Sequence, residues 1–242
     1  MLISDGNDAG EILKYLLNSI NRKYIEIIGS KYKIDTKSGR YTEEILNKVK
    51  YIMETENILI LKDLDMIYPS LYDLFNQNFT IMGNKQFARI AFEYAKISSE
   101  VNPNFHVVIL VDNLQIQNLK LDPPFLNRFE KHILNYKMLL TEEDIKVAEK
   151  IVEFINLIST FNNNKNLKID LEKLLINCKQ HDIEGLVFKI KNNFIESKKS
   201  KNKKLDYESF VIKEVFEKIT PTFCQDIIAS IISSKLSKIM MN

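Results

Sequence analysis

Short apolar runs alternate with helical patterns along the first 140 residues of the chain. In the helical patterns, apolar residues recur every three or four positions, which is typical of helices that cover a sheet. Strands that alternate with helices favour a parallel sheet. We therefore expect an α/β core of three layers around a five-stranded parallel sheet, with strands at residues 1–4, 24–28, 58–61, 106–111 and 131–134.

Two longer helices are predicted inside this core. The first begins at Asp8, where Glu11 three residues later completes a capping box. The second is capped by Thr42. Residues 69–77 are expected to form a short helix, and residues 79–92 are expected to form a hairpin.

Beyond residue 140 the pattern predicts helices alone. Thr141 caps the first of them, with Asp144 at its third helical position. We therefore divide the chain into an α/β core over residues 1–140 and an all-α helical lid over residues 141–242. Further lid helices are expected at residues 171–178, 183–194, 207–219 and 221–239.

Composition narrows the class of protein. The 242 residues carry 34 Lys and Arg against 32 Asp and Glu, a formal net charge of +2, which argues against a strongly basic nucleic-acid tail. Two cysteines form neither a disulfide framework nor a tetrahedral metal site, and the histidines lack metal-ligand spacing. No apolar run approaches the ~20 residues of a membrane span. We expect a cytoplasmic protein that binds no metal, and for which nucleic acid is an unfavoured partner.

An α/β core followed by a small helical unit suggests an AAA+ ATPase, so the phosphate loop is the first test. That loop needs the pattern G-x-x-x-x-G-K-[ST], which is absent. The segment after the first strand contains Gly6 and Gly10. It also contains three acidic residues, Asp5, Asp8 and Glu11. Like-charge repulsion argues against a triphosphate there. We interpret Gly6 as a turn residue and Gly10 as a close helix–strand contact, the remains of a degenerate phosphate loop.

The carboxylates that hold magnesium in an ATPase are also displaced. The third strand ends Leu61-Lys62-Asp63-Leu64-Asp65, where an active site would carry Asp followed by Glu. Asp63 and Asp65 are the candidates for that role, and the alternative is that they cap the following turn. Asn113, after the fourth strand, stands where AAA+ proteins place a residue that senses the outer phosphate.

Arg128 lies in the most specific stretch of the sequence, residues 121–132, after two consecutive prolines. In a ring of such modules, an arginine here is placed to act as a finger on a neighbour's nucleotide. The structural alternative is that Arg128 pairs with Glu130 or with an acidic neighbour at an interface.

Five segments together resemble one AAA+ module of the mysterin-type giant RING-finger E3 ubiquitin ligases, which carry a dynein-like row of AAA+ units. The resemblance runs from about residue 1 to residue 140 and weakens through the lid. The segments are residues 27–31, 52–55, 71–77, 101–105 and 126–132.

This resemblance implies a whole protein that transfers ubiquitin from a conjugating enzyme to a substrate, through ligase elements absent from these residues. It implies that ATP and magnesium are bound by neighbouring modules and that this module has no cofactor of its own. Adjacent AAA+ modules are then its direct partners, and the chain would be a fragment or a short gene product.

We therefore expect a degenerate, non-hydrolysing AAA+ module that acts as a scaffold, with no catalytic residue of its own. Two other hypotheses stay open. One is a working ATPase that holds ATP through an unusual loop and Asp63 or Asp65. The other is a clamp-loader-like subunit that contacts nucleic acid through the lysine-rich segment at residues 198–204.

Overall fold

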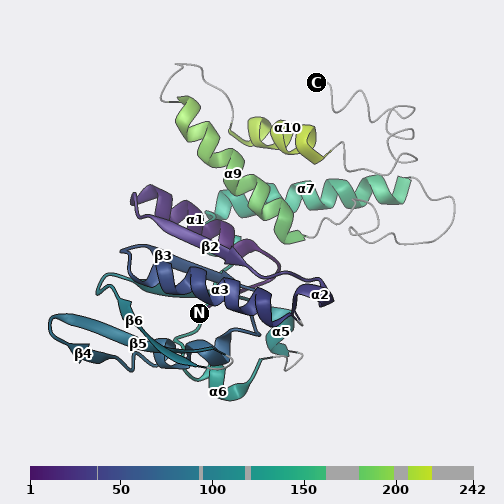
Figure 1. Cartoon of the computed structure of the whole chain (residues 1–242). Helices are drawn as coiled ribbons and strands as arrows, with labels where there is room; N and C mark the ends of the chain where they lie inside the picture. The colour runs from purple at the N-terminus through teal and green to yellow at the C-terminus, as the bar shows by residue number, and fades with distance from the viewer. Residues whose placement is uncertain (37, 93–94, 118–120, 162–179, 199–206, 220–242) are drawn as a thin grey trace. The chain divides into compact units, whose positions relative to one another are not determined.

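A computed structural model describes residues 1–36, 38–92, 95–117, 121–161, 180–198 and 207–219 (Figure 1). The chain divides into two compact units, Met1–Asn135 and Tyr136–Asn242. Each unit is described by itself.

The first unit is built on a five-stranded parallel sheet with the strand order β2-β3-β7-β1-β8. The predicted five-stranded parallel sheet is therefore confirmed. Its strands are β1 (Leu2–Ser4), β2 (Tyr24–Ile28), β3 (Ile58–Lys62), β7 (His106–Asp112) and β8 (His132–Ile133).

Helices α1 (Asp8–Ser19) and α3 (Gly39–Met53) cover opposite faces of this sheet (Figure 1). Successive side chains of β3 alternate between the two faces, because the side-chain period of a strand is two. Leu59 and Leu61 pack in the cluster that includes α3, and Ile60 packs in the cluster that includes α1. All three side chains are fully buried, which explains why β3 is a continuous apolar run up to Lys62.

Both helices begin differently from the sequence-based expectation. The Asp8 capping box is wrong, since Asp8 is the first helical residue, Asn7 is the N-cap, and the Ala9 N–H donates to Ser4 Oγ at 3.0 Å. Helix α3 begins at Gly39, with Ser38 as N-cap, one turn before the predicted cap Thr42. The Thr42 hydroxyl instead lies within the first helical turn.

A second, antiparallel sheet is inserted between β3 and β7. It contains β4 (Thr80–Met82), β5 (Lys85–Ala91) and β6 (Lys96–Val101), paired in that order. The predicted hairpin is present, but the sequence pattern did not predict β6. Short helical segments complete the unit: α2 (Lys33–Thr36), η1 (Tyr68–Leu71), α4 (Tyr72–Phe75), α5 (Asn113–Gln117) and α6 (Pro123–Leu126).

The second unit is helical where the structure describes it. It contains η2 (Tyr136–Met138), α7 (Glu142–Phe161), α9 (Gln180–Lys198) and α10 (Tyr207–Ile219). The helices predicted at residues 171–178 and 221–239 lie outside the described residues. Among the helices that are described, none is long and apolar enough to cross a bilayer.

The buried Asp144 carboxylate joins all three long helices of this unit. At the start of α7 it accepts hydrogen bonds from the Thr141 N–H at 2.8 Å and the Thr141 hydroxyl at 2.6 Å. It also accepts from Lys191 of α9 and Tyr207 of α10. Burial alone would raise the pKa of Asp144, but these donors lower it to about 2.

Candidate functional site

The carboxyl ends of four parallel strands meet at a cavity of about 850 Å³. Ligands of open α/β sheets bind at this edge. Residues from β1, β2, β3 and β7, or directly after them, line the cavity: Gly6, Asn7, Ser30, Lys31, Lys62, Asp63, Asp65, Met66, Asp112, Leu114 and Gln115.

The turn between β1 and α1 has only three residues, 5–7, and Gly6 adopts a φ of 64°. The first helical turn is closed by the protein itself. The Ala9 N–H is taken by Ser4 Oγ, and the Gly10 and Glu11 N–H groups donate to the Asn7 carbonyl at 3.1 and 3.2 Å. These amides are therefore engaged within the chain and do not point at an anion.

Gly10 does not line the cavity and packs against the sheet instead. A Cβ atom at Gly10 would lie 3.0 Å from Leu110 Cδ1 and 3.2 Å from Asn7 Oδ1. The absence of a side chain lets α1 approach β7 closely.

Lys62, the last residue of β3, reaches across the cavity. Its Nζ donates to Asn7 Oδ1 at 2.7 Å. A second cation, Lys31, lies 3.7 Å from Asp63 Oδ2 through its Nζ. Two lysines from different strand ends therefore converge on this cavity, which the sequence analysis did not predict. The cavity wall carries these two lysines and three aspartates, Asp63, Asp65 and Asp112.

Asp63 follows β3 directly and adopts a left-handed backbone, with a φ of 54°. Its Oδ1 accepts from Gln115 Nε2 at 3.2 Å, and its buried Oδ2 has no hydrogen-bond partner among the described residues. The next residue, Leu64, is fully buried in the apolar core. Asp63 and Asp65 both line the cavity.

Gly29 lets the backbone after β2 lie close to the backbone after β3. Its N–H donates to the Lys62 carbonyl at 2.8 Å. A Cβ atom there would stand 1.7 Å from the Asp63 carbonyl oxygen. A glycine at the end of a strand is a signal for such a close backbone approach.

Asn113, the first residue of α5, donates from Nδ2 to Asp5 Oδ1 at 3.3 Å. With the bonds from Lys62 to Asn7 and from Gln115 to Asp63, it completes a set of three contacts that we call the side-chain bridges. They join the β1–α1 turn, the end of β3 and the start of α5.

Arg128 does not line this cavity. Its guanidinium carbon lies 3.8 Å from the centroid of the Tyr72 ring, and its Nη1 donates to the Pro124 carbonyl. The alternative pairing with Glu130 is absent, because Glu130 instead pairs with His132 at 3.2 Å.

Aromatic rings cluster around Phe125, three residues before this arginine. Phe125 stacks on Tyr68 with centroids 4.6 Å apart, and Phe75 and Phe129 contact Phe125 edge-on. Burial raises the pKa of Tyr68. The segment around residues 68–75 and the segment around residues 123–129 are thus held together by aromatic contacts.

No group of three or more potential metal ligands occurs within the described ranges. The lysine-rich segment begins at Lys198, the last residue of α9, and otherwise lies outside those ranges.

Residues 1–140 match the family model described as "RNF213 AAA domain". Curated proteins similar to this chain include the E3 ubiquitin-protein ligase RNF213 of Homo sapiens, 26% identical over 121 residues, and that of Mus musculus, 24% identical over 128 residues. The E3 ubiquitin-protein ligase rnf213-beta of Danio rerio is 26% identical over 155 residues. These alignments cover 49%, 53% and 62% of this chain. They span only 2–3% of the length of the relatives.

Proposed function

Because this chain belongs to the RNF213 AAA domain family, we propose that it is an AAA+ module of a larger E3 ubiquitin ligase that neither binds nor hydrolyses ATP itself. Its role is to hold neighbouring AAA+ modules in a fixed arrangement. In such an assembly the neighbours bind ATP and magnesium, and a ligase region outside these residues receives ubiquitin from a conjugating enzyme. We place this assembly in the cytoplasm.

The side-chain bridges are the observation that carries this proposal. In a nucleotide-binding module, the ligand itself links the turn after the first strand, the end of the third strand and the polar residue after the fourth. Here Lys62–Asn7, Asn113–Asp5 and Gln115–Asp63 link the same three places. The module therefore has a ligand-free means of holding its strand ends together.

The residues present do not fit a triphosphate with magnesium. A three-residue turn is shorter than a glycine-rich phosphate cradle, and its helix amides are occupied by Ser4 and Asn7. Hydrolysis also needs a carboxylate or amide that orients water beside the metal ligand. The residue after Asp63 is Leu64, which is fully buried in the core.

One specific observation favours the rival function, an ATPase with an unusual site. Lys31, Lys62 and Asp63 all line a cavity that has the volume of a small-molecule pocket. The Asp63 Oδ2 atom is buried and makes no hydrogen bond with any described residue, as an unfilled ligand position would.

A thermal-shift titration with ATP and magnesium distinguishes the two functions, with isothermal calorimetry as the second readout. A ligand at one hundred times its Kd stabilises a protein by about 2.7 kcal/mol, which is measurable as a shift of the midpoint. We expect no saturable shift with ATP, ADP or AMP. A saturable rise that Asp63→Asn removes, and that Asp122→Asn, an exposed control outside the cavity, leaves intact, contradicts the proposal and supports the ATPase.

A further inference from the structure

Strand β2 has one open edge. It is the outermost strand of the five-stranded sheet and pairs with β3 alone (Figure 1). Just before the strand, the Lys23 carbonyl accepts the Ile58 N–H at 3.1 Å, and just after it the Gly29 N–H donates to the Lys62 carbonyl at 2.8 Å. In a parallel ladder, alternate residues bond to the same neighbour. Odd-numbered residues from 23 to 29 therefore turn their backbone groups toward β3.

The even-numbered residues Tyr24, Glu26 and Ile28 turn theirs toward the open edge. These three N–H and three C=O groups have no hydrogen-bond partner among the described residues. A row of free groups of this kind is a template for another strand.

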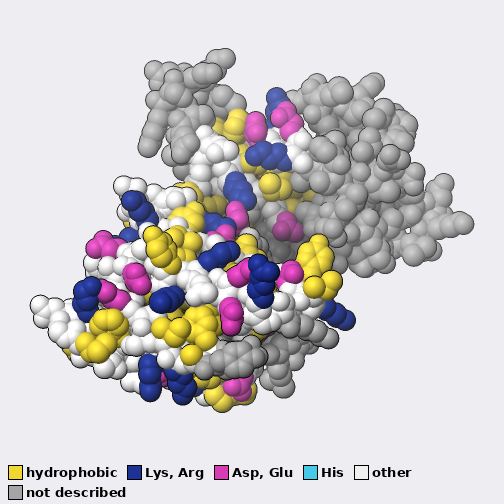
Figure 2. Space-filling model, in the orientation of Figure 1, with side chains coloured by type: hydrophobic (Ala, Val, Ile, Leu, Met, Phe, Trp, Pro, Cys, Tyr) yellow, Lys and Arg dark blue, Asp and Glu magenta, His cyan; other side chains and the backbone are white. Residues whose placement is uncertain are grey.

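A groove of about 650 Å³ runs between this edge and α3. Two of the side chains that line the groove are hydrophobic and exposed to solvent. Ile25 is 37% exposed and Tyr51 is 74% exposed. In Figure 2, hydrophobic side chains form patches among charged ones on the face of this unit. Helix α3 supplies one side of the groove through Tyr41, Ile45, Asn47, Lys48, Tyr51 and Ile52.

We propose that the open edge of β2 binds an extended peptide segment of a partner protein as a sixth strand. The backbone of the peptide pairs with Tyr24, Glu26 and Ile28. Every second side chain is apolar and enters the groove beside α3, because side chains of a strand alternate between its faces. Backbone pairing combined with a side-chain groove is the arrangement used for strand addition. This inference goes beyond the proposed function and does not depend on it.

Charge in the groove indicates an acidic residue in the partner. The groove contains the exposed Lys48, which forms no ion pair with any side chain that the structure describes. Glu26 also borders the groove, but its side chain points to the opposite face of the sheet, where its carboxylate pairs with Lys14 of α1 at 2.7 Å. A carboxylate on the bound peptide beside Lys48 thus complements the groove.

The same charges argue against a second copy of this chain as the occupant. In an antiparallel pair of two β2 strands that uses all five residues, Glu26 lies directly opposite Glu26. Like charges directly opposite one another destabilise a strand pair. The symmetry of such a pair also places a Lys48 on each side of the joint, without an acidic partner.

The test begins with a random octapeptide library displayed on phage and selected on the 242-residue protein. We expect enriched peptides to carry apolar residues at every second position and at least one Asp or Glu. A synthetic form of an enriched peptide should slow hydrogen exchange at the amides of Tyr24, Glu26 and Ile28. No enrichment, or enrichment without alternation, overturns the proposal.

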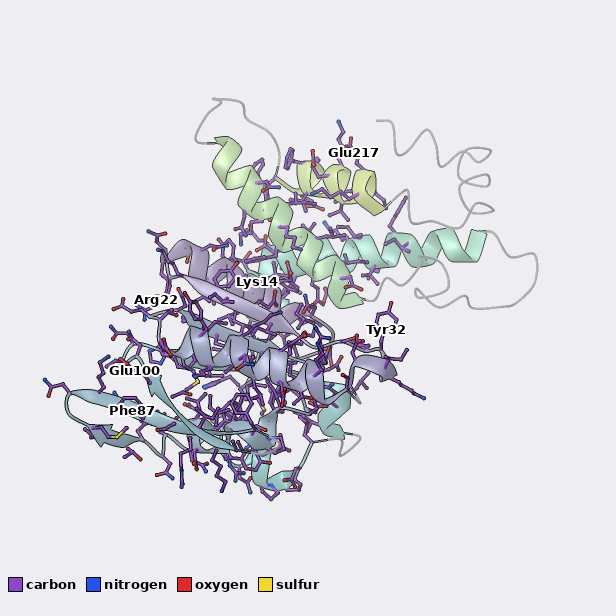
Figure 3. All side chains as sticks on the ribbon, viewed as in Figure 1. Lys14, Arg22, Tyr32, Phe87, Glu100 and Glu217 are labelled. Carbon is purple, nitrogen blue, oxygen red and sulfur yellow. The ribbon has the colours of Figure 1, made fainter. Side chains whose placement is uncertain are left out.

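Variants then locate the binding site. Glu26→Pro removes an N–H that faces the open edge but none that bonds to β3, and should weaken binding about tenfold or more. Tyr51→Ala should weaken it about five- to tenfold through lost apolar contact, and Lys48→Glu should weaken it about fivefold. Tyr32→Ala is the matched control, since Tyr32 is 78% exposed and lies directly before α2, outside the groove (Figure 3). It should leave affinity unchanged.

A change in the peptide keeps the result independent of whether Glu26→Pro folds. N-methylation of every second peptide bond removes the N–H groups along one edge of the bound peptide. Methylation of the N–H groups that face β2 should abolish binding to the unchanged protein. Methylation of the N–H groups on the other edge should not. Equal binding of both forms overturns the proposal. The proposal is also overturned if the amides of Tyr24, Glu26 and Ile28 are protected from hydrogen exchange without peptide and the protein sediments as a dimer. That result would assign the open edge to a second copy of the chain.

Discussion

The guanidinium of Arg128 lies over the ring of Tyr72, with its central carbon 3.8 Å from the ring centroid. The two residues belong to segments more than fifty positions apart in the sequence, α4 and the turn after α6. A cation over an aromatic face is attracted by the ring quadrupole, by about 0.5–2 kcal/mol depending on solvation. This contact gives Arg128 a role inside its own module.

A double-mutant cycle tests that role. Arg128→Ala and Tyr72→Leu should each destabilise the first unit, and their coupling energy should be about 1 kcal/mol. Urea unfolding followed by circular dichroism measures it. The arginine-finger hypothesis expects a different result, in which Arg128→Ala leaves the stability of the isolated chain unchanged and affects only assembly with a neighbouring module.

The Lys62–Asn7 bridge should also show coupling. Lys62→Met keeps most of the length of the side chain but removes the ammonium that donates to Asn7 Oδ1. Because the contact is partly exposed, we expect Lys62→Met to lower the free energy of unfolding by about 0.5–1 kcal/mol. When Asn7→Ala is already present, the bridge is absent, and Lys62→Met should cause no further loss. Hydrogen exchange at the start of α1 is the measurement. Additive losses would mean that the bridge contributes nothing.

Gly29→Ala should be far more disruptive than its size suggests. The added methyl group would stand 1.7 Å from the Asp63 carbonyl oxygen, which belongs to the backbone and has no rotamer to adopt. We expect a loss of more than about 3 kcal/mol. Gly83→Ala is the matched control, because Gly83 has a φ of +63° but nothing within 4 Å of the added atom. It should cost only about 1–2 kcal/mol, from its left-handed backbone.

Asp144 should make the stability of the helical unit depend on acid. Its pKa falls from 3.8 to about 2 on folding, so it stabilises the folded state by about 2 kcal/mol above pH 4. That contribution is lost as the pH falls from about 4 to about 2, where the folded carboxylate also takes up a proton.

Asp144→Asn isolates this effect from that of other carboxylates. The variant should be less stable than the unchanged chain at pH 7, and the difference should shrink toward zero near pH 2. Thermal unfolding monitored by circular dichroism across this range is the measurement. Glu142→Gln, an exposed change in the same helical turn, should show a small difference that hardly varies with pH. A difference for Asp144→Asn that stays constant with pH would contradict the pKa argument.

Apolar periodicity was sufficient to predict the core of the first unit. The limits of β2 are those predicted, and β3 and β7 differ by one residue at the end, because buried parallel strands are continuous apolar runs. Strand β6 was missed because its inward-facing residues include Ser99, which is buried as deeply as an apolar residue. A polar residue at an inward position hides the alternation on which strand prediction depends.

The site was less predictable than the fold. Asp63 and Asp65 were identified because they follow a recognisable strand. The convergence of Lys31 and Lys62 depends on β2 and β3 being neighbours in the sheet, and sequence order does not state strand order. Arg128 was placed in a specific motif, but its contact with Tyr72 is a tertiary relationship that spacing does not reveal.

The side-chain bridges are formed by the chain's own residues. Under the proposed function, the module therefore keeps the same strand-end geometry at every concentration of ATP, whether the cell is energy-rich or starved. It follows that a missense change at Asn7, Lys62 or Gln115 has no metabolite to rescue it, unlike a weakened enzyme that its substrate restores. Defects in this module would then accumulate as loss of folded protein.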